Sequence, residues 1–181
     1  MKHAVGGKGP PATAELILGI DPGLGVTGYA VVEPLRSGVR VVEAGVLRPG
    51  QTSRPLAERL DVLHQGIVEL IEAFRPTSMA LEQVHSHAKF PRTALLMAHA
   101  RGVIVLAAVQ NRVAIHGYAA TRIKKTLTGS GRADKEQMQR AIRVELGLDK
   151  VPEPHDVADA CAVALCHCQM ERNRRGAFGP S

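Results

Sequence analysis

The strongest structural signal in the chain is ELILGIDPGLGVTGYAVVE, residues 15–33. An apolar run ends on a single acid, Asp21, and a glycine-rich turn then leads into a second apolar alternation. Because glycine adopts the backbone conformations that tight turns need, this pattern predicts two strands joined in a hairpin. An acid at the end of a core strand is unfavourable unless something compensates it, and a divalent cation is one such partner. Asp21 is therefore a candidate metal ligand; the alternative is an acid that merely opens a Pro-Gly turn.

The composition bounds the size and the partners of the protein. The 181 residues suit one domain, and 45% of them are hydrophobic. The formal net charge is +6 and the isoelectric point is about 9.6, which is compatible with a polyanionic partner but is weak evidence for one. With no Trp, two Tyr and three Phe, the chain can hardly build stacking platforms for single-stranded bases. We expect any nucleic acid to be recognised through its backbone and shape.

The cysteines indicate a reducing compartment. Cys161, Cys166 and Cys168 lie close together on one predicted helix, and an odd number so placed does not form a disulfide framework. His167 joins them in sequence, but adjacent residues on a helix point in different directions and cannot close a tetrahedral metal site. We therefore predict buried free thiols and a cytoplasmic location. No apolar run is expected to span a bilayer, and no hydrophobic signal core precedes residue 15.

Hydrophobic periodicity predicts an ordered region at residues 15–171, between a disordered tail at 1–14 and a flexible basic tail at 172–181. We expect strands at 16–21, 27–33, 39–47, 78–81 and 113–118, and helices at 54–74, 93–109, 122–127, 134–146 and 155–170. Ser53 is the predicted cap of the first helix, which stops before Pro76. This order combines hairpins with β-α-β crossovers, so it implies an α/β fold with a mixed five-stranded sheet. The helix at 93–109 is apolar all round in its second half, and we expect the sheet and a second subunit to cover it.

Three further acids stand where a core or a cap would be the ordinary explanation. Glu82 finishes the strand at 78–81, and Asp156 and Asp159 share a face in the first turn of the last helix. Taken singly, Glu82 is better explained as an exposed acid at a strand end, and the two aspartates as helix caps. Together with Asp21, however, they would repel one another at one edge of the sheet unless divalent cations held them. Two cations about 4 Å apart on shared carboxylates are a device for hydrolysing phosphodiesters.

Basic residues dominate the segment from Arg122 to Arg143. They are Arg122, Lys124, Lys125, Arg132, Lys135, Arg140 and Arg143. The segment is interrupted by a Gly-Ser-Gly loop and precedes the helix that carries two of the acids. A solvated helix face and a surface for a nucleic-acid backbone both explain it.

Five motifs, in order, resemble the RuvC Holliday-junction resolvases: GIDPGLGVTGYAVVE, ALEQV, ARGVIVLAAV, YAATRIKKTLTGSGRADK and PHDVADACAVALCH. The resemblance runs from about Leu16 to Met170, nearly the whole chain. It implies the ribonuclease-H-like fold, with three antiparallel and then two parallel strands. It also implies a homodimer that nicks four-way DNA junctions with Mg²⁺ or Mn²⁺ in recombination and repair, leaving 5′-phosphate and 3′-hydroxyl ends, and that works with a branch-migration helicase complex.

The resemblance also assigns roles to residues. The catalytic acids, which would hold two Mg²⁺ ions per subunit, fall on Asp21, Glu82, Asp156 and Asp159. The residues near the junction backbone fall on Lys124 and Lys135, with Arg122, Lys125 and Arg132 as further candidate contacts. Family members often carry a junction wedge, a Phe three residues after the strand-end Glu. This chain has His85 there, so His85 and Phe90 are both candidates for the wedge.

Three other functions fit parts of the sequence. Actin-like ATPases and sugar kinases begin with a similar hairpin but need a second such domain, for which this chain is too short. A junction-binding module without catalysis would be expected to lack one of the acids. A related metal-dependent nuclease acting on other branched DNA shares the metal site and differs only in substrate shape.

Overall fold

A computed structural model of the chain describes residues 15–83 and 91–177. At its centre lies one five-stranded sheet with the order β3-β2-β1-β4-β5. The strands are β1 (Ile17–Asp21), β2 (Thr27–Pro34), β3 (Val39–Leu47), β4 (Ser78–Glu82) and β5 (Ala114–Tyr118). β1, β2 and β3 pair antiparallel, whereas β4 pairs parallel to β1 and to β5. The predicted mixed sheet is confirmed.

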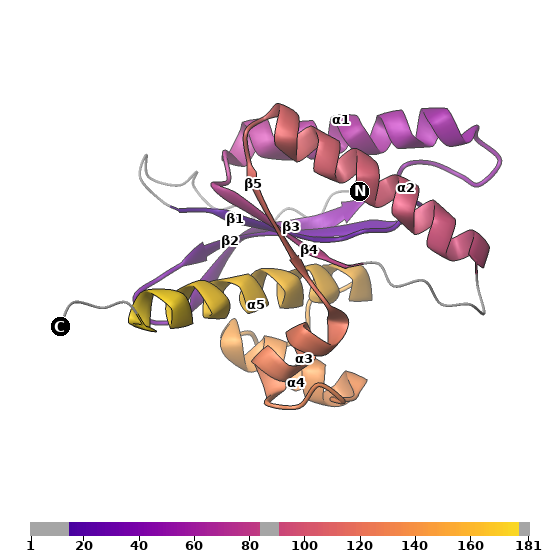
Figure 1. Cartoon of the computed structure of the whole chain (residues 1–181). Coiled ribbons are helices and arrows are strands. Elements are labelled where there is room, and N and C mark those ends of the chain that lie inside the picture. The colour runs from indigo at the N-terminus through magenta and orange to yellow at the C-terminus, as the bar shows by residue number, and fades with distance from the viewer. Residues whose placement is uncertain (1–14, 84–90, 178–181) are drawn as a thin grey trace.

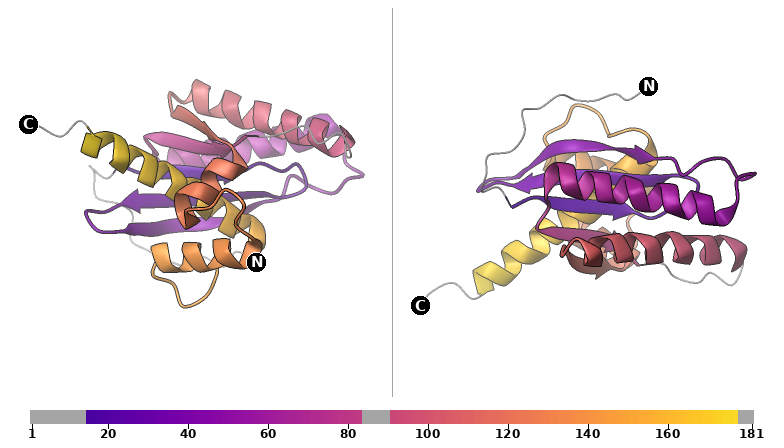
Figure 2. Two further views of the ribbon diagram at one scale, coloured as in Figure 1. Left: turned by 60° about the horizontal axis from the view of Figure 1, so that its bottom comes forward. Right: turned by 90° about the horizontal axis from the view of Figure 1, so that it is seen from above.

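Helices cover both faces of the sheet (Figure 1). They are α1 (Leu56–Phe74), α2 (Pro91–Gln110), α3 (Ala120–Thr128), α4 (Lys135–Glu145) and α5 (His155–Ala177). α1 and α2 lie side by side on one face (Figure 2), and α5 crosses the other with α3 and α4 packed beneath it (Figure 1). The molecule therefore has three layers, with the sheet in the middle.

Each face of the sheet has its own core, because successive side chains of a strand point to opposite sides. Leu18 and Ile20 of β1 pack with Leu63 and Ile67 of α1. Ile17, on the other face, belongs to the cluster built around the small apolar residues of α5. Since both faces are covered, β1 is a central strand that is apolar up to Asp21.

Most predicted boundaries lie within two residues of the observed ones, and two predictions at helix ends are wrong. Pro55, not Ser53, is the N-cap of α1, and it forms no side-chain cap bond. The last helix continues to Ala177, beyond the predicted start of a basic tail at residue 172. Its extension is held by tertiary contacts: Arg172 donates to the carbonyl oxygens of Leu35 and Gly38 in the turn between β2 and β3.

The prediction that no segment could span a bilayer is wrong by the criteria of length and composition. Residues Arg92–Gln110 of α2 form 19 helical residues with a mean hydropathy of 1.5. A helix in the core of a soluble protein can meet the same criteria of length and composition. Ile104 and Ala107 of this helix are fully buried in the core shared with α1 and the sheet, while Leu106 and Val109 are exposed. One side of the helix is thus covered within the subunit and the other is not.

Candidate active site

Asp21 and Glu82 meet because their strands run in parallel. β1 and β4 are hydrogen-bonded neighbours in which Ile20 pairs with Leu81. The next residue of each strand is the acid, so both carboxylates stand at the same edge of the sheet. Both are half-buried there.

The first turn of α5 lies at the same edge because it packs against a glycine of β2. Gly28 pairs with Asp21 across β1 and β2. A methyl group at Gly28 would lie only 1.9 Å from the carbonyl oxygen of Asp156. The backbone of α5 therefore rests directly on β2 beside Asp21, and only a residue without a side chain permits this approach. The contact carries Asp156, and Asp159 one turn later, to the acidic edge.

The charges of the other three acids act on Asp21. The pKa of Asp21 is raised from 3.8 to about 7, first by burial and then by the negative charges of Asp159, Glu82 and Asp156. The pKa of Asp159 is also raised, first by burial and then by Asp156, while His155 and Lys135 oppose the shift. The structure thus brings the four predicted acids together, whereas their catalytic role stays a prediction.

The donor set at this edge fits a hard divalent cation. Carboxylate oxygens are the ligands that Mg²⁺ and Mn²⁺ prefer. A carboxyl with a pKa near 7 among three other acids is also a group that bound cations would return to its charged form. Asp21 is the acid whose pKa all three of the others raise.

The predicted DNA contacts differ in their relation to the acids. Lys135, the first residue of α4, lies close enough for its charge to lower the pKa of Asp159. Arg122 on α3 acts instead on Cys166, in the middle of α5. Lys124 is half-buried on α3, while Lys125 and Arg132 are exposed. His85 and Phe90, the two wedge candidates, lie outside the described residues.

The similarity to known proteins decides the family. A family model described as crossover junction endodeoxyribonuclease RuvC matches residues 17–167. The chain belongs to this RuvC family. A RuvC relative from Rhodopirellula baltica is 50% identical over 165 residues, which are 90% of this chain and 91% of the relative.

Solved RuvC structures agree with the sequence match. The structure of Thermus thermophilus RuvC aligns with a TM-score of 0.82 at 30% identity, covering 88% of this chain and 96% of that one. A second structure, T. thermophilus RuvC in complex with Holliday junction substrate, aligns with a TM-score of 0.81 at the same identity and coverage. The resemblance seen in the sequence is confirmed, and the chain is a crossover junction endodeoxyribonuclease of the RuvC family.

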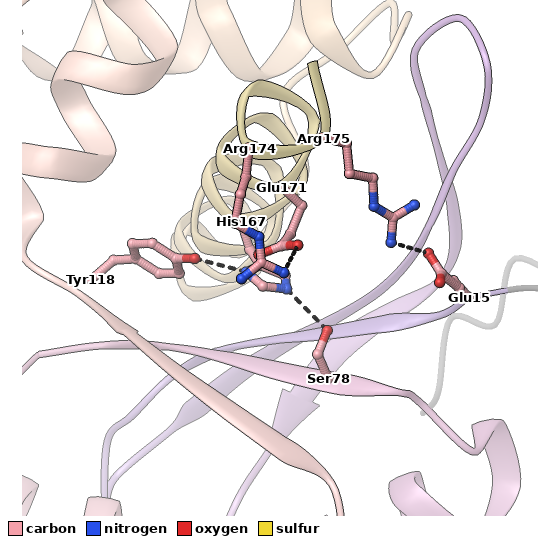
Figure 3. A network of polar contacts seen from close by, with 7 residues as sticks. All are labelled: Glu15, Ser78, Tyr118, His167, Glu171, Arg174 and Arg175. Atoms are coloured by element: carbon pink, nitrogen blue, oxygen red, sulfur yellow. Dashed lines mark hydrogen bonds and ion pairs between the residues drawn. The ribbon is translucent and has the colours of Figure 1, made fainter. Parts of the chain in front are cut away.

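This RuvC-family chain has a second polar cluster that its sequence did not predict. His116 of β5 and His167 and Glu171 of α5 place one potential ligand atom each within 4.8 Å of one another, and the group could hold a metal ion. Ser78 and Tyr118 contact His167 from two sides (Figure 3). The missed signal was the spacing of His167 and Glu171, because residues four apart share a helix face.

Proposed function

We propose that this chain nicks four-way (Holliday) DNA junctions symmetrically in homologous recombination and DNA repair, leaving 5′-phosphate and 3′-hydroxyl ends. Its membership of the RuvC family supports the reaction, and the junction complex of the T. thermophilus relative supports the substrate. The observation that carries the proposal is geometric: the parallel pairing of β1 with β4 and the contact of α5 with Gly28 bring Asp21, Glu82, Asp156 and Asp159 to one edge of the sheet.

We propose that Asp21, Glu82, Asp156 and Asp159 hold two Mg²⁺ ions, for which Mn²⁺ can substitute. Bound there, the ions would activate a water molecule for attack on phosphorus and stabilise the leaving oxygen. Asp21 takes the shared position because each of the other acids acts on it. Asp21, Glu82 and Asp156 are half-buried, which limits water around them and strengthens their hold on the ions, while Asp159 is exposed.

The basic residues of α3 and α4 would position the DNA backbone. Lys135 is the best placed of these, since its charge already reaches Asp159. Lys124, Lys125, Arg122 and Arg132 extend the positive charge away from the acids. Contacts of this kind fix the register of the DNA without reading its sequence.

A homodimer would make the cleavage symmetric, because a two-fold axis presents two equivalent sites to strands of like polarity. The exposed apolar side of α2, which includes Leu106 and Val109, supports this surface as the contact. We further propose that the dimer works with a branch-migration helicase. A cytoplasmic location is consistent with three cysteines that are all buried and free.

The test is the variant Asp21→Asn, assayed on synthetic four-way junctions with Mg²⁺ and with Mn²⁺. We expect junction binding to persist and nicking to fall below detection, because the amide cannot replace the shared carboxylate. The matched control is Asp61→Asn, which changes an exposed aspartate of α1 on the other side of the sheet. Nicking by Asp21→Asn at the rate of the unchanged protein would refute the two-ion scheme.

The same assay separates the rival functions. Tight junction binding by the unchanged protein without cutting, in either metal, would indicate a binding module. Faster cutting of flap or duplex DNA than of junctions would indicate a nuclease for another DNA structure.

A further inference from the structure

We propose that His116, His167 and Glu171 form a second metal site, which binds a borderline transition-metal cation such as Zn²⁺. The site joins the edge strand β5 to α5 on the face of the sheet that α5 covers. His167 follows Asp159 by eight positions on the same helix, which is about 12 Å along its axis. The two sites therefore differ in place and in ligand chemistry.

The three side chains converge without any rearrangement of the backbone. Their potential ligand atoms lie within 4.8 Å of one another. The rings of His116 and His167 are 4.3 Å apart between centroids and tilted by 34°. Glu171 stands one turn beyond His167 on the same side of the helix, so a cation between them would be held from both the strand and the helix.

The charge state of His167 suits ligation. Burial, and after it the neighbouring His116, lower the pKa of His167 from 6.5 to about 4. The imidazole is therefore neutral near pH 7, which is the form that binds metals.

The hydrogen bonds of His167 provide the support that metal-binding histidines require. The Tyr118 hydroxyl lies 2.7 Å from Nδ1, and the Ser78 hydroxyl lies 3.0 Å from Nε2 (Figure 3). A ligating histidine typically keeps a hydrogen bond on its other nitrogen, which fixes the tautomer and the ring. On binding, one nitrogen of His167 would exchange its hydroxyl partner for the cation, and the other would retain its own.

The groups facing the cluster include one competitor for the cation. Arg174 pairs with Glu171 at 2.7 Å, and its charge also lowers the pKa of His167. The Arg174 side chain is 67% exposed, so it can turn into solvent when a cation takes the carboxylate. A second ion pair nearby, Arg175 with Glu15 at 2.8 Å, satisfies another positive charge.

Access and ligand type select the class of metal. A pocket of about 170 Å³ is lined by His116, His167 and Glu171 and gives the cation a route from solvent. Two imidazoles and one carboxylate suit Zn²⁺ and similar cations, whereas Mg²⁺ favours sites made of oxygen ligands alone. Three protein ligands leave a fourth position for water.

The experiment titrates Zn²⁺ into the full-length, tag-free, metal-stripped protein against a chromophoric chelator. It uses the Asp21→Asn background, which weakens the acidic site. We expect one equivalent to bind with a Kd in the micromolar range or tighter, and Co²⁺ to give the absorption bands of a site with nitrogen ligands. His116→Gln and Glu171→Gln should each weaken binding at least tenfold. The control, His64→Gln, changes a histidine of α1 that hydrogen-bonds Gln110 on the other face and should bind as before.

Arg174→Ala provides a readout that a purely structural role would not move. Removing the competing guanidinium should tighten Zn²⁺ binding several-fold, and thermal unfolding without metal shows whether each variant is folded. Zn²⁺ binding that is equal in folded His116→Gln and in the parent would overturn the proposal, as would binding no tighter than millimolar in the parent. Since the titration uses the Asp21→Asn background, failure here would leave the proposed junction cleavage unaffected.

Discussion

Two features of Asp21 disfavour its charged carboxylate in the absence of a cation. It ends a central strand, so its carboxyl loses solvent, and it faces three other acids. Both effects favour the protonated form, which explains why its pKa rises to about 7. In the metal-free protein near neutral pH, the charged carboxylate is therefore electrostatically unfavourable, and either a proton or a bound cation removes this cost.

The raised pKa of Asp21 predicts how the stability of the metal-free protein depends on pH. The pKa of Asp21 in the folded protein lies above the ordinary value of 3.8. Its contribution to the free energy of unfolding is therefore fully present below pH 3.8 and is lost as the pH rises to about 7. Asp21→Asn removes this loss. By urea denaturation in EDTA, we expect the variant to be more stable than the unchanged protein at pH 8, by on the order of a few kcal/mol, and the gap to narrow at pH 5.

Comparing the two proteins cancels the titration of groups that do not interact with Asp21. His167, whose pKa is lowered to about 4, contributes stability above pH 6.5 that is lost as the pH falls toward 4, equally in both. Saturating Mg²⁺ should reverse the order at pH 8, because only the intact carboxylate gains from the cation. Equal stabilities at pH 5 and pH 8 in EDTA would contradict the high pKa of Asp21.

The sequence was sufficient to predict which acids gather but not the second cluster. Asp21 and Glu82 could be placed because parallel neighbours end at one edge, and Asp156 and Asp159 because three positions on a helix share a face. In the sequence, the neighbours of His167 are Cys166 and Cys168. Its real partners come from strand β5 and from the next turn of α5, and strand-to-helix packing of this kind leaves no periodic signal.

At the level of elements, α5 holds two of the four acids, Asp156 and Asp159. Its position depends on glycines beneath it: a methyl group at Gly19 would lie 2.4 Å from the carbonyl oxygen of Ala160, and one at Gly28 would lie 1.9 Å from that of Asp156. The helix thus contacts the backbone of β1 and β2 directly. The position of two acids is set by residues that take no part in the chemistry.

This packing predicts the effect of Gly28→Ala. The added methyl group meets backbone atoms, which cannot move aside as a flexible side chain can, so the first turn of α5 must shift. A displacement of about 1 Å in a catalytic group can slow a reaction about 100-fold, and we expect a loss of that order in single-turnover nicking. The control is Gly25→Ala in the same turn region, where nothing lies within 4 Å. Circular dichroism should show both variants folded, and nicking by Gly28→Ala at the normal rate would contradict the packing argument.

The boundaries of the elements were predictable where local pattern decides them. α4 begins where expected because Asp134 forms a capping box with Gln137, a purely local arrangement. The predictions failed where the outcome depends on the surroundings. Ser53 resembles a cap, but the chain enters α1 through Pro55. The basic end of α5 resembles a tail, but the carbonyl oxygens of the β2–β3 turn hold Arg172 in the helix.

At the level of the whole molecule, α2 has an apolar surface that the described residues, 15–83 and 91–177, leave exposed. Leu95, Leu106 and Val109 are 61%, 51% and 60% exposed. Full burial of a leucine or valine side chain contributes about 1.5–3 kcal/mol, and a two-fold axis would count each residue twice. A surface of this kind on the face opposite α5 suits a homodimer in which both acidic sites remain open to DNA.

The proposed homodimer predicts a specific effect of Leu106→Glu. Because a two-fold interface brings a residue and its copy close together, the change would remove an apolar contact and set two negative charges into a surface that excludes water. We expect the variant to sediment as a monomer at micromolar concentration, where the unchanged protein sediments as a dimer. Its junction cleavage should change from paired to single nicks, because each monomer carries one acidic site. Val144→Glu, at a residue of α4 that is 68% exposed, adds the same charge away from α2 and should stay dimeric. If Leu106→Glu also stays dimeric, the subunits meet through some other face, and the symmetric placement of the two sites would have to be built from that face instead.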